Sequence, residues 1–479
     1  MRRRALLDWL DLDRARAEPL QEQMAQQLRN AIMQGEMPSG MALPSSRSLA
    51  KDLGVSRGTV TAVYDRLLGE SLLEVKGRSA TFVSTVAAPM VVQRHPRTAS
   101  PLEGSVQSRG EMPPPYPAFS PGMPAFDLFP AERWGRLLSS RYRQMTADLA
   151  GESIHIGGFA ALRRALAEHL VVARGLICEP RQVLVTSSAR GALSALCRML
   201  AKPGDRCLVE DPGYFIVGEV VKGLGLEVVA IPVDGDGLVV EPFLPSAKMA
   251  YVTPTHQMPT GARLAESRAR RLIEWARREN AWIIEDDYDS EFRYVGQPLV
   301  ALQRSDPHGR VIYVGTFSKT LFPSLRTAFF VVPEDMVAAA ERAVFMNGLE
   351  PPLHLQAALA DFIDQGLYAK HIRKARLVYR HRQQLLVEAL NQHMGDITRS
   401  AGPPGGMNMV LPLPAGVPAH LVQYEAARQS LHVRPPSFYA VRAPAPNALH
   451  LGFAAVQERH IEPAAKRLAD IVRGLLPAR

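Results

Sequence analysis

The sequence predicts an α/β protein that carries a winged helix-turn-helix at its N-terminus. Before residue 85 the hydrophobic pattern indicates three helices and then a β-hairpin. After residue 117 short β-rich runs alternate with helical patterns, which is typical of a large α/β domain on a largely parallel sheet. From residue 350 onward helices dominate, so a smaller α+β lobe is expected there. We therefore divide the chain into residues 1–84, a linker over 85–117, and residues 118–479.

The composition is that of a folded protein with a basic surface. Of 479 residues, 47% are hydrophobic and 22% charged, which is ordinary for a globular chain. The formal net charge of +9 favours an anionic partner, although basic surfaces often only keep a protein soluble. Three cysteines in no metal-ligand spacing fit the reducing cytoplasm, and we expect no metal site. No signal peptide or membrane span is expected, because Asp8 interrupts the first apolar run and no later run approaches about 20 residues.

The elements of the N-terminal domain follow from its hydrophobic spacing. Apolar residues recur at helical spacing from Leu20 to Ile32, and glycine and proline then end the first helix. A second short helix is expected over residues 46–53, and Ser56 can cap a third. Two β-rich runs within residues 72–83, separated by Lys-Gly-Arg, predict the hairpin.

The third helix has the composition of a helix that reads DNA. Its inward face is apolar: Val60, Val63, Tyr64 and Leu67. A recognition helix needs short polar or basic side chains in its first turn, where it enters the major groove, while neighbouring elements contact phosphates. The expected DNA-binding residues are Ser45, Arg47, Ser56, Arg57, Thr59, Thr61, Lys76 and Arg78. A helical domain that binds protein is the alternative, since residues 1–84 hold twelve Lys and Arg against ten Asp and Glu.

Residues 85–117 show no hydrophobic periodicity and are rich in proline. A packed connection of this length would be unusual, so we interpret the segment as a linker that is extended where proline is dense. Beyond it, six β-rich runs are expected to form strands: residues 182–186, 206–210, 226–231, 249–252, 282–285 and 311–314. Helical patterns such as those over residues 160–174 and 264–279 alternate with them. Open α/β sheets bind ligands beyond the carboxyl ends of their strands.

Reactive residue types follow two of these strands. Lys319 comes after the last strand, and Asp286 and Tyr288 close the strand before it. A single lysine is usually solvated and a run of carboxylates is often a surface loop, so neither is decisive alone. Together they meet three needs of a Schiff base with pyridoxal phosphate: an amine, an acid for the pyridine nitrogen and a donor to the phenolic oxygen.

The same cofactor needs an anion cradle and a ring that stacks on it. The turn Ser188-Ala189-Arg190 joins a strand to a helix, so its N–H groups can bind phosphate, although such a turn is weak evidence by itself. Tyr214 offers an aromatic ring, but a turn of this kind more often holds an ordinary core tyrosine.

The order and spacing of these segments resemble fold-type-I aminotransferases. Residues from about 119 to 479 resemble more closely the effector domain of the MocR/GabR subfamily of GntR-type regulators. The matching stretches are residues 119–122 (FSPG), 127–130 (DLFP), 210–214 (EDPGY), 253–261 (TPTHQMPTG), 285–292 (EDDYDSEF) and 315–326 (GTFSKTLFPSLR). The N-terminal domain resembles the GntR-type winged helix at residues 44–50 (PSSRSLA) and 53–60 (LGVSRGTV). The resemblance therefore spans nearly the whole chain.

The resemblance implies an aminotransferase-like domain of pyridoxal-phosphate fold type I with a smaller C-terminal lobe. It implies Lys319 as the Schiff-base lysine, Asp286 at the pyridine nitrogen and Tyr288 at the phenolic oxygen, with Tyr214 stacked on the ring. The implied phosphate contacts are Ser188, Ala189, Arg190, Thr316 and Arg326. It also implies a homodimer in which the DNA-binding domain of one chain lies over the large domain of the other.

Three positions depart from the enzyme pattern. Met258 stands where the enzymes usually place an asparagine before Pro-Thr-Gly, and His450 stands where an arginine often binds the substrate carboxylate. Arg434 and Arg442 are nearby in sequence and are candidates to replace that arginine. Ala189-Arg190 replaces a common Ser-Gln, so backbone groups would carry more of the phosphate binding.

Three functions are open at this point. The first is a pyridoxal-phosphate-dependent transcriptional regulator that binds double-stranded DNA and senses the cofactor or an amine or amino-acid effector. The second is a working aminotransferase with an accessory DNA-binding domain; Met258 and His450 argue against efficient turnover, so at most a residual half-reaction is expected. The third is a sensor whose site has lost the cofactor. The pairing of the two domains favours the first.

Overall fold

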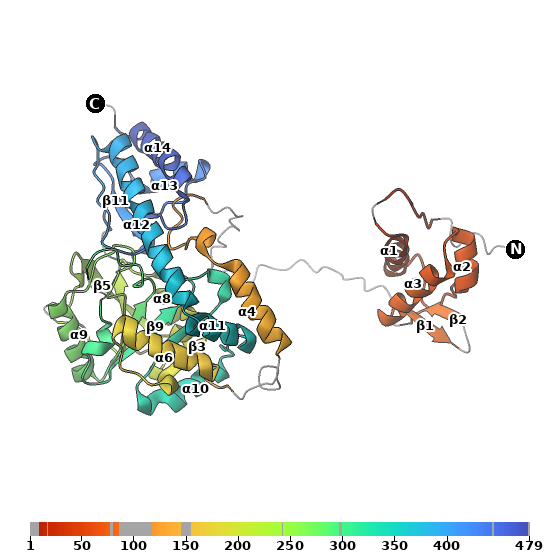
Figure 1. Cartoon of the computed structure of the whole chain (residues 1–479), viewed down its shortest axis with the longest axis horizontal. Helices are drawn as coiled ribbons and strands as arrows, with labels where there is room; N and C mark the ends of the chain where they lie inside the picture. Colours follow the sequence, from red (N-terminus) through yellow and green to blue (C-terminus); the bar gives the residue numbers. More distant parts are fainter. Residues whose placement is uncertain are drawn as a thin grey trace. The chain divides into compact units, whose positions relative to one another are not determined.

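The computed structural model describes residues 9–16, 18–76, 80–85, 117–144, 155–241, 243–296, 299–442 and 445–477 (Figure 1). The chain divides into two compact units, Met1–Arg109 and Gly110–Arg479, which are described separately below. Most of the predicted linker, and Arg78 at the predicted hairpin tip, lie outside the described residues.

The smaller unit has the predicted order of three helices and a hairpin. Its elements are α1 (Leu20–Met33), α2 (Ser46–Leu53), α3 (Arg57–Gly69), β1 (Leu73–Lys76) and β2 (Ala80–Val83). The two strands pair antiparallel, with Leu73 opposite Val83. The predicted inward face of α3 is buried, and Val60, Val63 and Leu67 are wholly inaccessible to solvent.

Local capping fixes where these helices begin and end. The Ser45 side chain accepts a hydrogen bond from the Ser48 N–H at the start of α2, and Ser56 accepts one from the Thr59 N–H at the start of α3. Gly54 ends α2 in the left-handed conformation, at φ 64°, which glycine adopts without strain. The chain therefore turns sharply between α2 and α3, as a helix-turn-helix requires.

The larger unit is built on an eight-stranded sheet of order β3-β10-β9-β8-β7-β4-β5-β6. Its strands are β3 (Val183–Thr186), β4 (Arg206–Asp211), β5 (Glu227–Asp234), β6 (Gly237–Leu238), β7 (Met249–Val252), β8 (Trp282–Asp287), β9 (Val311–Thr316) and β10 (Ala328–Val331). The strands from β9 to β5 in that order are parallel. Because β10 runs antiparallel to both β3 and β9, β3 points the same way as β9. The predicted mainly parallel sheet is confirmed.

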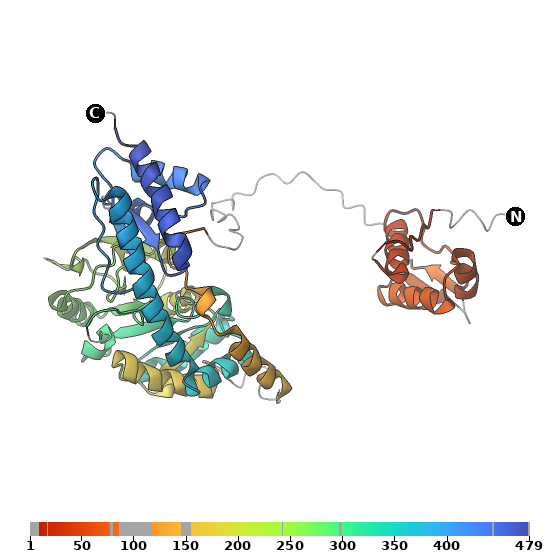
Figure 2. The ribbon, with the colours of Figure 1, turned by 45° about the horizontal axis from the view of Figure 1, so that its top comes forward.

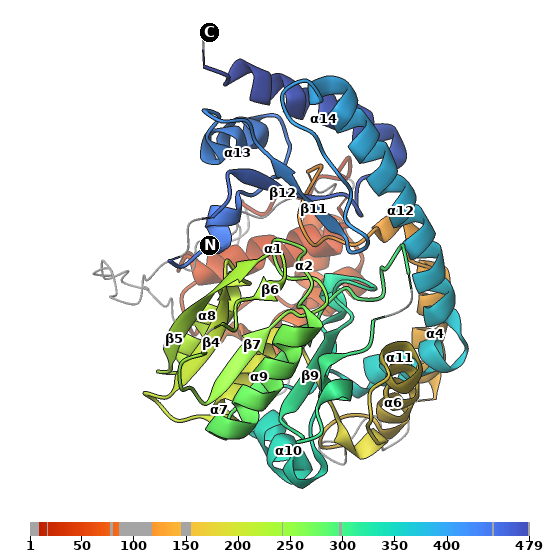
Figure 3. The same ribbon diagram turned by 90° about the vertical axis from the view of Figure 1, so that its left-hand side faces the viewer.

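Helices cover both faces of the sheet (Figure 3). The helices of this part are α4 (Ala131–Arg143), α6 (Ala160–Arg174), α7 (Ala189–Leu200), α8 (Phe215–Gly223), α9 (Glu266–Glu279), α10 (Val337–Met346) and α11 (Leu353–Asp364). Alternate strand residues point to opposite faces. Ile283 therefore packs in the apolar cluster of α9, while its neighbour Ile284 packs in the cluster of α7, α8 and α10.

A long helix, α12 (Leu367–Met394), leads into the smaller lobe (Figure 2). That lobe contains β11 (Asn408–Pro412), α13 (Ala419–Arg428), β12 (Ala448–Gly452) and α14 (Glu458–Gly474). Short 3-10 helices join the elements of the unit: η1 (Phe126–Leu128), η2 (Pro180–Gln182), η3 (Leu302–Ser305), η4 (Pro323–Leu325), η5 (Glu334–Met336) and η6 (Pro436–Tyr439). Among the described residues no helix is long and apolar enough to cross a membrane.

A buried ion pair holds the carboxyl end of β8. Arg174, the last residue of α6, places its Nε 2.6 Å from Oδ2 of Asp287, and both side chains are at most 5% exposed. The same Oδ2 accepts hydrogen bonds from the Tyr313 hydroxyl at 2.6 Å and the Ser290 hydroxyl at 2.9 Å. Arg174 also donates to the Thr255 hydroxyl at 2.9 Å and to the Leu299 carbonyl. One guanidinium thus joins α6, β8 and the loop after β7.

Replacing Arg174 with methionine should destabilise the larger unit by about 3–5 kcal/mol, because the buried carboxylate of Asp287 is left without its cation. Differential scanning calorimetry of the full chain measures this as a fall in the transition of the larger unit. Arg277→Met is the matched control, since its ion pair with Glu274 is half exposed, and its transition should not move. Equal behaviour of the two variants would contradict the structural role of the Arg174–Asp287 pair.

Candidate functional site

In the smaller unit the predicted DNA-binding residues line the start of two helices. Ser45 and Arg47 are exposed at the beginning of α2, and Ser56, Arg57 and Thr61 are exposed around the first turn of α3. Thr59 is half-buried and its hydroxyl lies 2.8 Å from that of Ser56. Polar side chains at the N-terminus of a second helix are the arrangement by which a helix-turn-helix meets the major groove.

Two of the basic residues that are predicted to bind DNA, Arg57 and Lys76, already have protein partners. Arg57 Nε donates to the Ser46 hydroxyl at 3.4 Å, which joins the starts of α2 and α3. Lys76 Nζ lies 2.8 Å from Glu74 Oε1 on the same strand. Both lysine and glutamate are substantially exposed, so phosphate can compete for this lysine.

In the larger unit the parallel strands bring the predicted cofactor residues to one edge of the sheet. Asp286 and Tyr288 lie at the carboxyl end of β8, and Thr316 and Lys319 at the end of its neighbour β9. Ser188 follows β3, and Tyr214 follows β4. Residues that are up to about 130 positions apart in sequence therefore share one edge, as expected for an open α/β sheet.

The amine of Lys319 contacts the segment that begins the larger unit. Its Nζ donates a hydrogen bond to the Gly122 carbonyl at 2.7 Å. A β-carbon at Gly122, which has φ +69°, would lie 2.7 Å from the same Nζ, so this position favours glycine. The Gly122 N–H in turn donates to Asn408 Oδ1 of β11 at 2.7 Å. Gly122 is a contact residue that the sequence did not single out.

Asp286 is buried with half of its hydrogen-bonding capacity unused. The Tyr251 hydroxyl donates to Oδ2, whereas Oδ1 is buried and has no hydrogen-bond partner among the described residues. Burial raises the pKa of Asp286 to about 6, although the hydrogen bond from Tyr251 and the charge of Lys319 lower it. A buried carboxylate oxygen without a donor is costly, so this atom fits the N–H of a pyridinium ring.

The neighbouring carboxylates have structural partners instead. Asp287 is occupied by Arg174 and Tyr313, as described above. Glu285 accepts hydrogen bonds from the N–H groups of Leu302 at 2.7 Å and Gln303 at 2.9 Å, at the start of η3. Asp286 and Asp287 each have one buried oxygen without a hydrogen-bond partner among the described residues. Asp287 is already paired with Arg174, however, whereas Asp286 lies where the charge of Lys319 affects its pKa.

A second buried acid supports the loop that carries Met258. Glu210 accepts hydrogen bonds from Thr253 N–H at 3.0 Å and from Gln257 Nε2 at 3.1 Å. Burial raises the pKa of Glu210 to about 7. Gln257 also donates to the Pro212 carbonyl at 2.8 Å, so it joins the loops after β4 and β7. Glu210 and Gln257 are two further residues that sequence reasoning missed; a buried acid at the end of a strand was the available signal.

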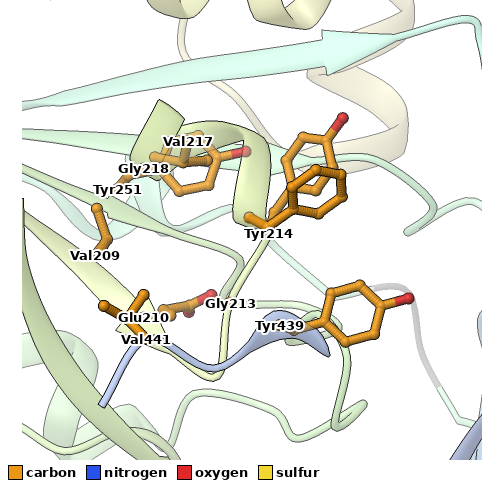
Figure 4. A pocket seen from close by; sticks show the side chains of 10 residues that line it. Val209, Glu210, Gly213, Tyr214, Val217, Gly218, Tyr251, Tyr439 and Val441 are labelled. Atoms are coloured by element: carbon orange, nitrogen blue, oxygen red, sulfur yellow. The ribbon is translucent and has the colours of Figure 1, made fainter. Parts of the chain in front are cut away.

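The pocket beside these residues is aromatic. Its lining includes Glu210, Tyr214, Tyr251 and Tyr439, and Figure 4 shows the three tyrosines gathered from separate segments. Tyr439 belongs to the smaller lobe, and its carbonyl accepts a hydrogen bond from the Gly213 N–H at 3.0 Å. Tyr288 is half-buried, and burial and the nearby acids raise the pKa of its hydroxyl, which therefore keeps its proton as a hydrogen-bond donor.

The residues predicted to bind phosphate lie at the N-terminus of α7, at the end of β9 and after η4. Ser188 is its N-cap and accepts a hydrogen bond from Gly191 N–H at 3.0 Å. Ala189 is half-buried in the first turn, whereas the Arg190 and Arg326 side chains are exposed. Thr316 accepts a hydrogen bond from the Ser318 N–H at 3.1 Å. The start of α7 thus offers a helix N-terminus, which favours an anion, and Arg190 and Arg326 are exposed cations.

The three candidate effector residues differ in their exposure and in their partners. His450 is 1% exposed and its Nδ1 lies 3.0 Å from the Tyr439 hydroxyl. Burial, with the charges of Arg434 and Lys319, lowers the pKa of His450 to about 3, so its imidazole is neutral. Arg434 pairs with His450 through the backbone and its guanidinium lies 4.1 Å from the Phe438 ring. Arg442 is exposed and reaches the site only through its N–H, which donates to Asp211 at 2.8 Å.

Comparison with protein families finds two matches on this chain. The model described as "Aminotransferase class I and II" matches residues 144–468. The model described as "Bacterial regulatory proteins, gntR family" matches residues 20–83. Each match falls on one of the two units.

Individual relatives match either the whole chain or its larger unit. The probable rhizopine catabolism regulatory protein MocR of Rhizobium meliloti is 37% identical, with 94% of this chain and 93% of the relative covered. The pyridoxine biosynthesis transcriptional regulator PdxR of Corynebacterium glutamicum is 33% identical, with 94% and 95% covered. The structure of kynurenine aminotransferase of Pyrococcus horikoshii in complex with PMP aligns with a TM-score of 0.68 at 28% identity, covering 76% of this chain and 92% of that one.

Asp286 should make the stability of the cofactor-free protein depend on pH. Because the pKa of Asp286 is raised to about 6, the folded state holds this proton more tightly than the unfolded state. The stability that this group contributes is therefore complete below about pH 4 and is lost as the pH rises through about 6. Asp286→Asn should be more stable than the wild type by about 1–3 kcal/mol around pH 7 and equal to it around pH 4. Denaturant unfolding of both proteins at the two pH values measures this, and an equal difference at both would contradict the raised pKa.

Proposed function

The chain belongs to the MocR subfamily of GntR-type transcriptional regulators, and from this premise we propose that its aminotransferase-like domain senses pyridoxal phosphate or an amine effector through Lys319. The winged helix-turn-helix binds DNA, and pyridoxal phosphate is the cofactor of the larger domain. The observation that carries the proposal is the unpartnered Oδ1 of buried Asp286, at the same edge of the sheet as Lys319.

Each residue at this edge has a specific task toward the cofactor. Bound pyridoxal phosphate supplies an aldehyde that condenses reversibly with primary amines. Lys319 provides the resident amine, Asp286 Oδ1 holds the proton on the pyridine nitrogen, and Tyr288 donates to the phenolic oxygen. Tyr214 would cover the ring. The phosphate would be bound by Ser188, Ala189, Arg190, Thr316 and Arg326.

The smaller lobe supports an effector that carries a carboxylate as well as an amine. His450 is neutral and bonded to Tyr439, so it cannot bind an anion as the usual arginine would. The backbone of Arg434 pairs with that of His450. The positive charges of Arg434 and Lys319 both lower the pKa of His450, so both lie close to it. Arg434 is therefore the cation that we assign to the effector carboxylate, in preference to the exposed Arg442.

An active aminotransferase is the second candidate, because Lys319, Asp286 and Tyr288 are all retained at the edge of the sheet. Met258 has no polar group with which to bond the phenolic oxygen, and neutral His450 does not replace an arginine. We therefore propose at most a single half-reaction. Repeated turnover with an amine donor and a keto-acid acceptor would decide for the enzyme.

We further propose that the chain acts in the cytoplasm as a homodimer, in keeping with the two-fold symmetry of most operators read by helix-turn-helix proteins. Sedimentation of the protein with and without operator DNA tests the dimer. A gel shift with DNA upstream of its own gene and of the divergently transcribed neighbour tests the regulator. Failure of the purified protein to bind either fragment would contradict the proposed function.

Lys319→Ala should abolish the visible absorbance of the lysine-bound cofactor and the response of DNA binding to added amines. DNA binding itself should persist, since the winged helix is a separate unit. Lys202→Ala, an exposed lysine in the same unit, is the control and should behave as the wild type. Absorbance titrations and gel shifts measure both properties; an unchanged amine response in Lys319→Ala would refute sensing through this residue.

Arg434→Gln should weaken the spectral response to amino acids roughly 10- to 100-fold, the usual loss for a charge-assisted hydrogen bond. Amines without a carboxylate should respond as in the wild type. Arg442→Gln is the control on the same segment, and its titrations should not change. If the two substitutions affect amino acids equally, Arg434 is not the carboxylate-binding residue.

A further inference from the structure

One face of α12 carries a row of lysine and arginine side chains, and none of them forms an ion pair with a described carboxylate. From residue 367 to residue 387 the helix contains no Asp or Glu. Residues 370, 373, 374, 377, 380 and 381 recur at the spacing of a single helical face, and all six are exposed. We call four of them the α12 stripe: Lys370, Arg373, Lys374 and Arg380. Leu377 lies among them and is 67% exposed.

The α12 stripe differs from the other arginine-rich helix of the same domain. On α9, four of five arginines are in ion pairs: Arg268 with Asp234, Arg271 with Glu241, Arg277 with Glu274, and Arg278 with Glu279. Among the described residues no ion pair involves any member of the α12 stripe. An ordinary solvated face mixes both signs of charge, as α9 does, whereas four neighbouring cations repel one another unless an anion is present.

The opposite face of α12 is fixed firmly to the domain. Arg382 is 1% exposed and its guanidinium forms ion pairs with Asp127 at 2.6 Å and Glu458 at 2.9 Å. The buried Tyr379 hydroxyl accepts a hydrogen bond from the Ala125 N–H at 2.9 Å. The α12 stripe is therefore presented by a rigid helix, and Figures 2 and 3 both show α12 on the outside of the larger unit.

The segment that leads from the linker into the larger unit is attached to this same helix. Ala125 and Asp127, which contact Tyr379 and Arg382, follow closely after Pro117, where the larger unit is first described. The first described residues of the larger unit pair with the segment after α13, through Ala118 and Leu431, and the chain then reaches α12 at Ala125 and Asp127.

The DNA-binding unit itself supplies little charge. Residues 1–84 contain twelve Lys and Arg against ten Asp and Glu, whereas the whole chain has a net charge of +9. Binding to duplex DNA depends strongly on cations that neutralise phosphates. Most of the excess positive charge is thus outside the domain that reads the sequence.

We propose that the α12 stripe is a second DNA-contacting surface, which binds phosphates of the duplex next to the site read by the winged helix-turn-helix. The contact is electrostatic and independent of base sequence, because lysine and arginine on one exposed helical face meet the backbone rather than base edges. The inference rests on the DNA binding of this regulator, and it adds the aminotransferase-like domain to the DNA interface.

The salt dependence of DNA binding tests the proposal on the full-length protein loaded with cofactor. The test variant replaces Lys370, Arg373, Lys374 and Arg380 with glutamine. The control variant replaces four exposed basic residues elsewhere on the same unit, Arg198, Lys202, Lys248 and Arg270, and so has the same net charge. Visible absorbance of the cofactor confirms that both variants are folded.

The slope of log Kd against log salt should fall by about 2 to 4 in the α12 variant, since each lost phosphate contact contributes about 0.9. Its Kd at low salt should rise at least ten-fold on operator and on unrelated DNA alike, while the control keeps the wild-type slope. Equal slopes in the α12 variant and the wild type would overturn the proposal but not the DNA-binding function, which the wild type reports. Equal losses of DNA affinity and of salt slope in both variants would also overturn the proposal, because they would show an effect of net charge alone. Normal DNA binding with loss of transcriptional control would assign the stripe to an acidic protein partner instead.

Discussion

The buried ion pair between Arg174 and Asp287 is the constraint on which the site depends. It joins α6 to the carboxyl end of β8 in a region that is almost inaccessible to solvent. Since successive residues of a strand point to opposite faces, fixing Asp287 toward Arg174 directs Asp286 toward Tyr251 and the amine of Lys319. Of three consecutive acids, Glu285 and Asp287 thus hold protein groups, whereas the middle one, Asp286, faces Tyr251 and Lys319.

The candidate sites of the two units lie on different kinds of surface. The cofactor edge is built from buried groups, such as Asp286 and Glu210, whose pKa values are raised by desolvation. The start of α3 offers exposed, short polar groups held by a capping serine. Neither surface provides a large excess of charge for a polyanion. The exposed face of α12 carries four lysine and arginine side chains that form no ion pair with a described residue.

Most of the fold could be predicted from the sequence, and so could the meeting of the candidate cofactor residues at one edge of the sheet, because both depend on local patterns. Strand endings placed Lys319, Asp286 and Tyr288 on one edge, and helical spacing identified the buried face of α3. The contacts of Tyr251 with Asp286 and of Gly122 with Lys319 were not predictable, since they join residues 35 and 197 positions apart. The different roles of Asp286 and Asp287 also emerge only from their packing partners. The protonation of His450 likewise depends on its burial, which its sequence position does not reveal.

The Lys319 amine donates a hydrogen bond to the Gly122 carbonyl, so a change at this nitrogen changes a contact of the segment around Gly122. If the cofactor were bonded to Lys319, its nitrogen would no longer be an ammonium available to this carbonyl. The same peptide is tied to Asn408 of the smaller lobe, and it follows shortly after the linker. A hydrogen bond from a charged donor contributes about 1.5–3 kcal/mol, so its loss shifts a two-state equilibrium at least ten-fold. The state of the lysine nitrogen is therefore coupled to how firmly the peptide at Gly122 is held against the rest of the domain.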